Sequence, residues 1–472
     1  MTQTSLPVFK FDFNALFGLM ILSLPLSIKL FFPPLQTEII YPAEILIGLI
    51  ALVYGYVLVF KKDVIPDKKF LRHPLTVLVL LYVTVHIISA AFSTMYVVSF
   101  KSLVVKICYI VVFYFIVHLL IRNSLTGFFD MIKLYGVSLL LVAIFSLAAH
   151  YQFGFTRGSS SFISYPFYTD HTIYAAALAF ILPAFILFSI SSDELNINSL
   201  KRTAFILSTV LITTALYFSF SRAAWISMIA VFMLWMLIAF RIKFYVLVSL
   251  ASIILILTFF NRQSFIESFK ENKVNSNELD AGLYEHIFSL TNITTDLSNA
   301  ERVNRWKCAI RMFRDKPILG FGPGTYQFKY FQYQKKEEMT PVSILEPIKP
   351  GATTYSWSPA NGITLGGNAS AYQGNGGSAH SEYFMALSET GIFSLIIFIG
   401  LMLMALKTGM KIFSKHPDKT VKIIALFALL GLTTYFVHGL FNNFLDDGKL
   451  AFLFWSSLSV LAAADSSSLK EV

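Results

Sequence analysis

The chain has 472 residues, of which 56% are hydrophobic and only 14% are charged. A soluble domain carries about 25% charged residues, so this composition excludes an ordinary soluble protein and indicates a membrane protein with many spans. The formal net charge of +10 at pH 7 then reflects membrane topology and not nucleic-acid binding, because basic residues collect in cytoplasmic loops.

Twelve segments are apolar enough to cross the hydrocarbon core as helices. They lie near residues 13–33, 39–60, 74–94, 102–121, 129–149, 172–190, 203–219, 223–240, 243–260, 383–405, 422–442 and 449–464. We expect an all-α polytopic membrane protein with about 12 transmembrane helices and one large extracytoplasmic loop. The expected division is 1–260 for helices one to nine, 261–379 for the loop with an amphipathic basic helix, and 380–472 for helices ten to twelve.

The short loops between these segments alternate in charge. One set holds Lys61, Lys62, Lys68, Lys69, Arg72, Arg122, Lys201, Arg202, Arg241, Lys243, Lys407, Lys411, Lys415 and Lys419. The other set is nearly bare: 34–38 has no basic residue, and 443–448 has only Asp446 and Asp447. Because positive loops stay in the cytoplasm, we expect both termini inside and the long loop outside.

Most of the out-of-place polar groups then fall on the outer side. They are Arg157, Asp170, His171, Arg222, Arg302, Arg305, His380, His438, Asn442 and Asn443. A protein without a site would scatter such groups over both faces. Their grouping predicts a functional site at the outer membrane surface.

Arg222 lies in FSFSRAAW, at the outer turn between the seventh and eighth expected spans. One interpretation is an arginine that extends its head group to the membrane interface. The other is an anion clamp, because the guanidinium offers a planar fork of donors suited to phosphate. The tight turn beside Arg222 favours a held geometry, and therefore the second interpretation.

The segment ERVNRWKCAIRMFRDKPILGFGPGTYQF begins at Glu301 and predicts a basic amphipathic helix that Pro317 ends. Its apolar residues with helical spacing are Val303, Trp306, Ile310 and Phe313. The helix could lie on anionic lipid, and Arg302 or Arg305 could bind a lipid-borne diphosphate; the two interpretations are compatible. GFGPG is not a nucleotide loop, since no Lys-Ser/Thr follows it.

The segment GGSAHSEYFMALSETGIFSLIIF places His380 at the start of a span and Glu389 nine residues inward. His380 is either a polar cap or a general base that works near neutral pH. Glu389 lies about half a turn out of phase with it on an ideal helix, so the two should not touch. We expect Glu389 to pair with an arginine of another span or to form a structural bond between helices.

The sequence contains no HExxH, CxxC or outer DxD pattern and no GxSxG turn. No metal site and no cofactor are therefore expected. If the chain is an enzyme, the chemistry that its residues favour is cationic stabilisation with one base.

Three blocks in this order resemble the O-antigen ligase/polymerase superfamily. They are SRAAW at 221–225, Arg302 four residues before Trp306 followed by DKPILGFGPGTYQF, and HSEYFMALSETGIF at 380–393. The resemblance covers roughly residues 200–410. It implies a membrane glycosyltransferase (GT-C-like) that takes a glycan from undecaprenyl diphosphate without a metal or a nucleotide.

The resemblance also implies roles for individual residues. Arg222 and Arg302 would bind the donor diphosphate, His380 would orient or deprotonate the acceptor hydroxyl, and Glu389 would support the site. We expect further substrate contacts from Arg305, Arg157, His171 and Tyr383. Arg305 would replace Arg302 if the register at Trp306 slips by a turn.

The implied setting is the bacterial inner membrane, with an extracytoplasmic active site and with membrane lipids around it. The implied acceptor is lipid A–core or another glycan, as in lipopolysaccharide assembly. A polymerase of O-antigen or exopolysaccharide, or a protein O-oligosaccharyltransferase, would use the same donor. A polysaccharide transporter or flippase is less favoured, because the residues in the middle of the spans are mostly apolar.

Overall fold

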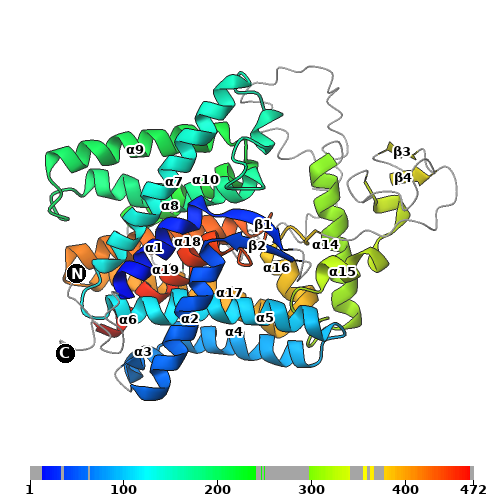
Figure 1. Cartoon of the computed structure of the whole chain (residues 1–472), viewed down its shortest axis with the longest axis horizontal. Coiled ribbons are helices and arrows are strands. Elements are labelled where there is room, and N and C mark those ends of the chain that lie inside the picture. Colours follow the sequence, from blue (N-terminus) through cyan, green and yellow to red (C-terminus); the bar gives the residue numbers. More distant parts are fainter. Residues whose placement is uncertain are drawn as a thin grey trace.

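The computed structural model describes residues 13–32, 37–61, 64–240, 246, 249, 297–340, 355–358, 362–365 and 377–467. These residues form a helical bundle with two small antiparallel hairpins (Figure 1). Within the first 240 residues the elements are α1 (Phe13–Leu26), β1 (Ile28–Phe32), β2 (Thr37–Tyr41), α2 (Ala43–Phe60), α3 (Lys68–Leu71), α4 (Pro74–Ala91), α5 (Tyr96–Ile110), the π-helix η3 (Val111–Ile116), α6 (Val117–Ile121), α7 (Gly127–Gln152), the 3-10 turn η4 (Ser159–Ser161), α8 (His171–Ile190), α9 (Ser199–Phe218) and α10 (Arg222–Ala239).

The second half carries the site-forming elements and the centre of the bundle. They are α14 (Leu297–Asp315), α15 (Tyr326–Lys329), the 3-10 turns η5 (Tyr330–Tyr333) and η6 (Lys336–Glu338), β3 (Tyr355–Ser358), β4 (Gly362–Leu365), α16 (Glu382–Met385), the π-helix η9 (Ala386–Thr390), α17 (Gly391–Lys415), α18 (Lys419–His438) and α19 (Gly448–Ser467). Helices α17, α18 and α19, orange to red in Figure 1, lie between the blue helices and the green ones.

Nine helical segments of the described residues are long and apolar enough to cross a membrane. They are Ala43–Phe60, Pro74–Ala91, Tyr96–Ile121, Gly127–Gln152, His171–Ile190, Ser199–Phe218, Arg222–Ala239, Glu382–Lys415 and Lys419–His438. Each corresponds to an expected span, so the all-α polytopic architecture is confirmed for this part of the chain. The span expected at 243–260 lies outside the described residues except for 246 and 249, and the count of twelve stays a prediction.

The first expected span, 13–33, is wrong in its second half. Helix α1 has only 14 residues and ends at Leu26, and Ile28 to Phe32 pair with Tyr41 to Thr37 in a hairpin. Pro33 and Pro34 follow this strand in the sequence. A proline lacks a donor and forces the preceding residue into an extended conformation, which favours a hairpin over a longer helix.

The last expected span, 449–464, corresponds to α19, which is not among the nine apolar segments. Every residue from 448 to 464 is buried within the protein. A helix that faces other helices in place of lipid tolerates serines, which explains the lower apolarity of α19.

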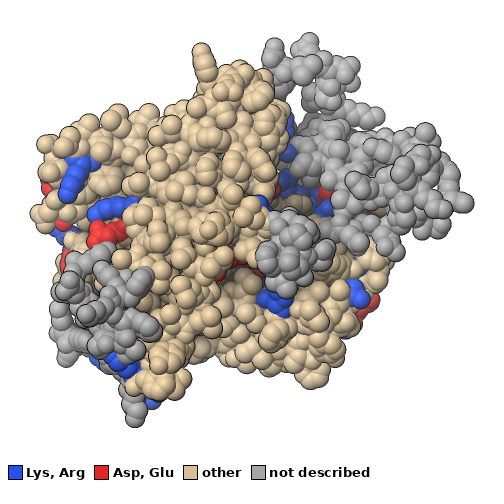
Figure 2. Space-filling model, viewed as in Figure 1, with Lys and Arg blue, Asp and Glu red and all other residues tan. Residues whose placement is uncertain are grey.

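The two ends of the bundle carry different elements. The start of α1 and the end of α19 lie at one end, and α14 and α15 lie at the other (Figure 1). In Figure 2 large uncharged areas cover the described face, and most Lys, Arg, Asp and Glu lie toward its two ends, with a smaller charged group near the centre. Large uncharged areas of this kind suit the hydrocarbon core of a bilayer. We call the end with α14 the site end.

Candidate functional site

Helix α14 is attached to the site end through a face that sequence periodicity did not indicate. Its fully buried residues include Cys308, Ala309 and Met312, which pack with Tyr326 and Tyr330 in a separate hydrophobic cluster. The apolar stripe that begins with Val303 and Trp306 is only partly buried. The helix ends at Asp315, as Pro317 predicts. The buried face of α14 is therefore the one that carries Glu301 and Arg305.

The glycine-rich loop after α14 docks against the end of α4. The hydroxyl of Ser89 donates to the carbonyl of Leu319 over 2.6 Å, and that of Ser93 donates to the carbonyl of Phe321 over 2.9 Å. A Cβ on Gly322, which has a φ of 111°, would overlap the hydroxyl of Ser93. The loop thus ties the segment after α14 to α4.

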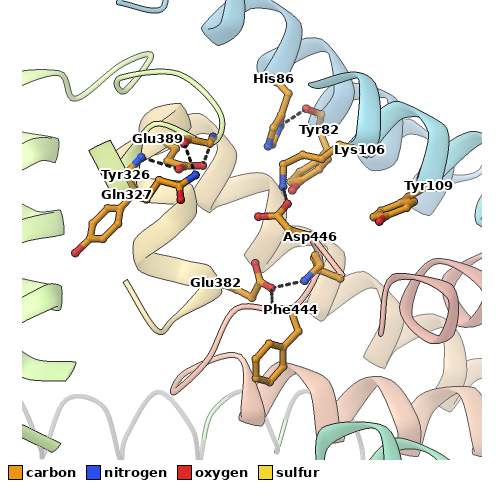
Figure 3. Close-up of polar contacts among 12 residues, drawn as sticks. Tyr82, His86, Lys106, Tyr109, Tyr326, Gln327, Glu382, Glu389, Phe444 and Asp446 are labelled. Carbon is orange, nitrogen blue, oxygen red and sulfur yellow. Dashed lines mark hydrogen bonds and ion pairs between the residues drawn. The ribbon is translucent and has the colours of Figure 1, made fainter. Parts of the chain in front are cut away.

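Glu389 holds the same loop from the other side. Its Oε2 accepts from the backbone N–H of Gly324 and its Oε1 from that of Tyr326, both over 2.9 Å (Figure 3). The side chain is buried and belongs to the π-helical turn η9. The arginine expected as its partner is therefore replaced by two backbone donors, and Glu389 fixes the position of the loop.

Glu382 anchors the start of the same helix to the turn before α19. Its Oε1 accepts from the backbone N–H groups of Phe444 and Leu445 over 2.7 and 2.9 Å and from the hydroxyl of Tyr435. Lys106 pairs with Asp446 beside it (Figure 3). The two glutamates therefore fix both ends of the segment that follows His380.

Arg305 is buried under the segment that leads to His380. Its Nε donates to Glu301 over 2.7 Å, its Nη1 donates to the carbonyl of Ser378 over 2.9 Å, and its guanidinium lies 5.0 Å from the ring centre of Tyr330. These contacts give Arg305 a supporting position. Its expected role as a substrate contact stays a prediction.

His380 has an unusual backbone conformation, with a φ of 48°. Its N–H donates to the hydroxyl of Ser378 over 3.3 Å. Burial, with Arg305 and Arg302 nearby, lowers the pKa of the imidazole from 6.5 to about 3. The ring is therefore neutral at physiological pH and has a free lone pair to accept a proton.

The charges of Arg302 and Asp170 influence three histidines at the site end. Both act on His380, on His171 at the start of α8, and on His438 at the end of α18. Asp170 also caps α8 by accepting from the N–H of Thr172 over 2.8 Å. The structure thus groups Arg302, His380 and His171, which the sequence singled out separately.

Arg157 and Arg222 occupy strained turns at this end. Arg157 acts electrostatically on His171 and follows Phe155, whose φ is 56°. Arg222 begins α10, directly after Ser221 and Phe220, whose φ is 50°. Helix α10 packs against α8 and α18, whose ends carry His171 and His438. Left-handed backbone at a bulky residue is costly and concentrates at functional sites.

Tyr383 lies inside the bundle. Its hydroxyl donates to the carbonyl of Phe436 over 3.0 Å, and its ring packs against Phe398 with centroids 5.2 Å apart. These contacts are structural, and its expected substrate contact stays a prediction. Among the described residues, no group of three His, Cys, Asp or Glu side chains could hold a metal ion.

Two parts of the site were not predicted from the sequence. One is Glu301, although its spacing to Arg305, i to i+4, is that of a helical ion pair. His438 and Asn442 were noted only as outer polar residues, and no local signal shows that both are buried.

Residues 207–344 match a family model described as O-antigen ligase. This part of the chain is therefore similar to the O-antigen ligase family. The match confirms the resemblance to the O-antigen ligase superfamily, and with the apolar helices it indicates a glycosyltransferase-like membrane enzyme. No curated protein matches the chain.

The O-antigen ligase match covers less than a third of the chain. It includes Arg222, Arg302 and the glycine-rich loop but ends before His380 and Glu389. The inclusion of those two residues in the site therefore rests on the geometry of the chain itself.

Proposed function

We propose that the protein transfers a glycan from undecaprenyl diphosphate to an acceptor hydroxyl at the outer face of the inner membrane, as an O-antigen ligase in lipopolysaccharide assembly. The observation that carries the proposal is the position of His380, two residues after the Ser378 carbonyl that Arg305 holds, at one end of a membrane bundle whose residues 207–344 match the O-antigen ligase family model. The proposed acceptor is lipid A–core.

The proposed reaction needs a base and a stabiliser of negative charge. The acceptor oxygen forms a bond with the anomeric carbon, the bond from that carbon to the diphosphate oxygen breaks, and undecaprenyl diphosphate leaves. His380 orients the acceptor hydroxyl and accepts its proton as the oxygen attacks. Arg222 and Arg302 stabilise the charge on the departing diphosphate.

The location of these groups supports a donor that arrives from lipid. Arg222 begins a helix that is long and apolar enough to span the membrane, and His380 lies two residues before another. A diphosphate at the membrane surface would therefore meet Arg222 while its lipid tail stays among the helices. The site end lies opposite the start of α1 and the end of α19, which supports cytoplasmic termini and an extracytoplasmic site.

The test uses purified protein in liposomes with undecaprenyl diphosphate that carries a labelled glycan, and lipid A–core as the acceptor. We expect label on lipid A–core with the wild type and none with His380→Ala or Arg222→Ala. Arg314→Ala is the control, because Arg314 is an exposed arginine on the same helix as Arg302, and it should transfer normally.

Two other outcomes decide against the ligase proposal. Longer glycans on the original carrier would identify a polymerase. Label that stays on its carrier under every condition would reject glycan transfer, and a flipping assay across the bilayer would then test the transporter alternative. A His380→Ala variant with normal transfer would remove His380 from the reaction.

A further inference from the structure

His438 is a buried histidine whose ring has no partner among the described residues. It ends α18, is 1% exposed, and neither Nδ1 nor Nε2 has a hydrogen-bond partner there. Its ring centre lies 5.6 Å from that of Phe444. A buried polar group without a partner is destabilising, so such a group in a native protein calls for a water or a ligand.

Asn442 adds a second unpartnered donor one turn further along the chain. It is 2% exposed, and its Nδ2 has no partner within the described part of the chain. Its backbone is fixed on both sides, since its N–H donates to the carbonyl of His438 over 3.1 Å and its carbonyl accepts from the N–H of Glu382 over 3.2 Å. The amide nitrogen of Asn442 therefore has no partner among the described residues, although the backbone that carries it is fixed.

Two other buried histidines of the bundle have a hydrogen-bond partner on one ring nitrogen, whereas His118 has none on either nitrogen among the described residues and lies with its Nε2 3.5 Å from a carboxylate oxygen of Asp67. The Nδ1 of His86 lies 2.8 Å from the carbonyl of Tyr82, and the Nε2 of His150 lies 2.9 Å from the carbonyl of Thr156. His438 differs in that Arg302 and Asp170 are the charged groups that act on it. These two residues also act on His380, so His438 belongs to the site end.

We propose that His438 and Asn442 bind the sugar residue that is attached directly to the donor diphosphate. A neutral imidazole offers one donor and one acceptor and the amide offers donors, which suits neighbouring hydroxyl or amide groups of a sugar. If Arg302 binds the diphosphate, the first sugar is the uncharged polar part of the donor next to it. This inference rests on the proposed function and names the part of the donor that these residues recognise.

The His438→Leu variant distinguishes sugar binding from a structural role. Replacement of an unbonded buried histidine by leucine removes a desolvation cost and loses no hydrogen bond within the protein. The His438→Leu variant should therefore unfold at the same or a higher temperature than the wild type. The loss of bonds to the sugar should at the same time lower kcat/KM about tenfold.

Binding measurements separate the sugar from the diphosphate. Native mass spectrometry in detergent would compare undecaprenyl diphosphate that carries one sugar with undecaprenyl diphosphate alone. We expect His438→Leu and Asn442→Ala to weaken binding of the sugar-bearing lipid about tenfold and to leave the bare lipid unaffected. Arg302→Ala should weaken both. His416→Leu, at the α17–α18 turn far from the site end, should change neither.

Each contrary result has a separate meaning. If wild type binds the two lipids differently and His438→Leu behaves as wild type, the sugar contact is wrong and the proposed function stands. If His438→Leu weakens both lipids equally, or unfolds earlier than wild type, His438 is structural and the inference fails. If the wild type binds neither lipid, the proposed function fails and this inference falls with it.

Discussion

Arg305 donates from Nη1 to the carbonyl oxygen of Ser378 over 2.9 Å, two residues before His380. The same guanidinium pairs with Glu301 over 2.7 Å, and the two side chains are 6% and 4% exposed. A Cβ at Gly377, whose φ is 91°, would overlap the guanidinium. Helix α14 therefore sets the position of the segment that presents His380.

The first prediction concerns this buried pair. Arg305→Ala removes the buried cation that faces the carboxylate of Glu301, and breaking a buried ion pair in this way costs about 3–5 kcal/mol. We expect a marked fall in the thermal unfolding temperature in detergent, with loss of transfer. The double variant Arg305→Ala/Glu301→Ala should recover part of that stability. Arg314→Ala on the exposed face is the control. Equal unfolding temperatures of Arg305→Ala and Arg314→Ala would contradict the prediction.

The second prediction concerns the contact between Glu389 and the loop. In Glu389→Gln, one of the two backbone N–H groups faces an amide N–H₂ in place of a carboxylate oxygen. A bond to a charged group contributes about 1.5–3 kcal/mol. The amides of Gly324 and Tyr326 should therefore exchange hydrogen much faster by mass spectrometry. The exposed Glu337→Gln is the control; unchanged protection in Glu389→Gln would show that the contact does not hold the loop.

The third prediction concerns the close approach of Gly322 to α4 and α5. Alanine at a φ of 111° is strained, and its Cβ overlaps the hydroxyls of Ser93 and Ser99. Backbone strain alone costs about 1–3 kcal/mol, so Gly322→Ala should release the loop and raise its cleavage in limited proteolysis. Gly158→Ala, which meets no atom within 4 Å, should be cleaved like wild type. Equal cleavage of the two variants would rule out tight docking.

The fourth prediction concerns pH. Because the pKa of His380 is lowered from 6.5 to about 3, the ring stays neutral as pH falls below 6.5, and kcat/KM should not decline there through its protonation. Arg302→Gln removes a cation that lowers the pKa, so any acid limb should move to higher pH. A wild-type limb near the ordinary histidine pKa of about 6.5 would disprove a lowered value.

The lowered pKa of His380 also predicts how folding stability changes with pH. Below pH 6.5 the unfolded chain binds a proton on His380 that the folded protein does not bind until about pH 3. Folding stability should therefore fall across this range as pH decreases. His380→Gln should make the decline shallower, and an unchanged slope of unfolding temperature against pH would contradict this.

The local sequence pattern predicted where helices end better than it predicted the partners of their side chains. Pro317 correctly limits α14, which ends at Asp315, because a proline disfavours helix in the residue before it. The expected pairing of Glu389 with an arginine was wrong, since its carboxylate binds the backbone of Gly324 and Tyr326. Periodicity has no information on partners more than sixty residues away.

Glu382 and Glu389 bind different parts of the protein, for a local reason. On a regular helix their spacing of seven residues places them on one face. The π-helical turn η9 between Ala386 and Thr390 widens the helix there. Glu382 consequently binds Phe444 and Leu445, whereas Glu389 binds the glycine-rich loop.

Composition and order of residues by themselves determined that this is a polytopic membrane protein, and the three motif blocks pointed to its superfamily, because hydropathy and short motifs are properties of contiguous sequence. The tertiary structure alone decided which polar residues lie near one another. Arg302, His171, His380 and His438 lie on four segments that are separated by up to 267 residues along the chain. Their proximity results from helix packing and from buried hydrogen bonds, which form only when those segments meet.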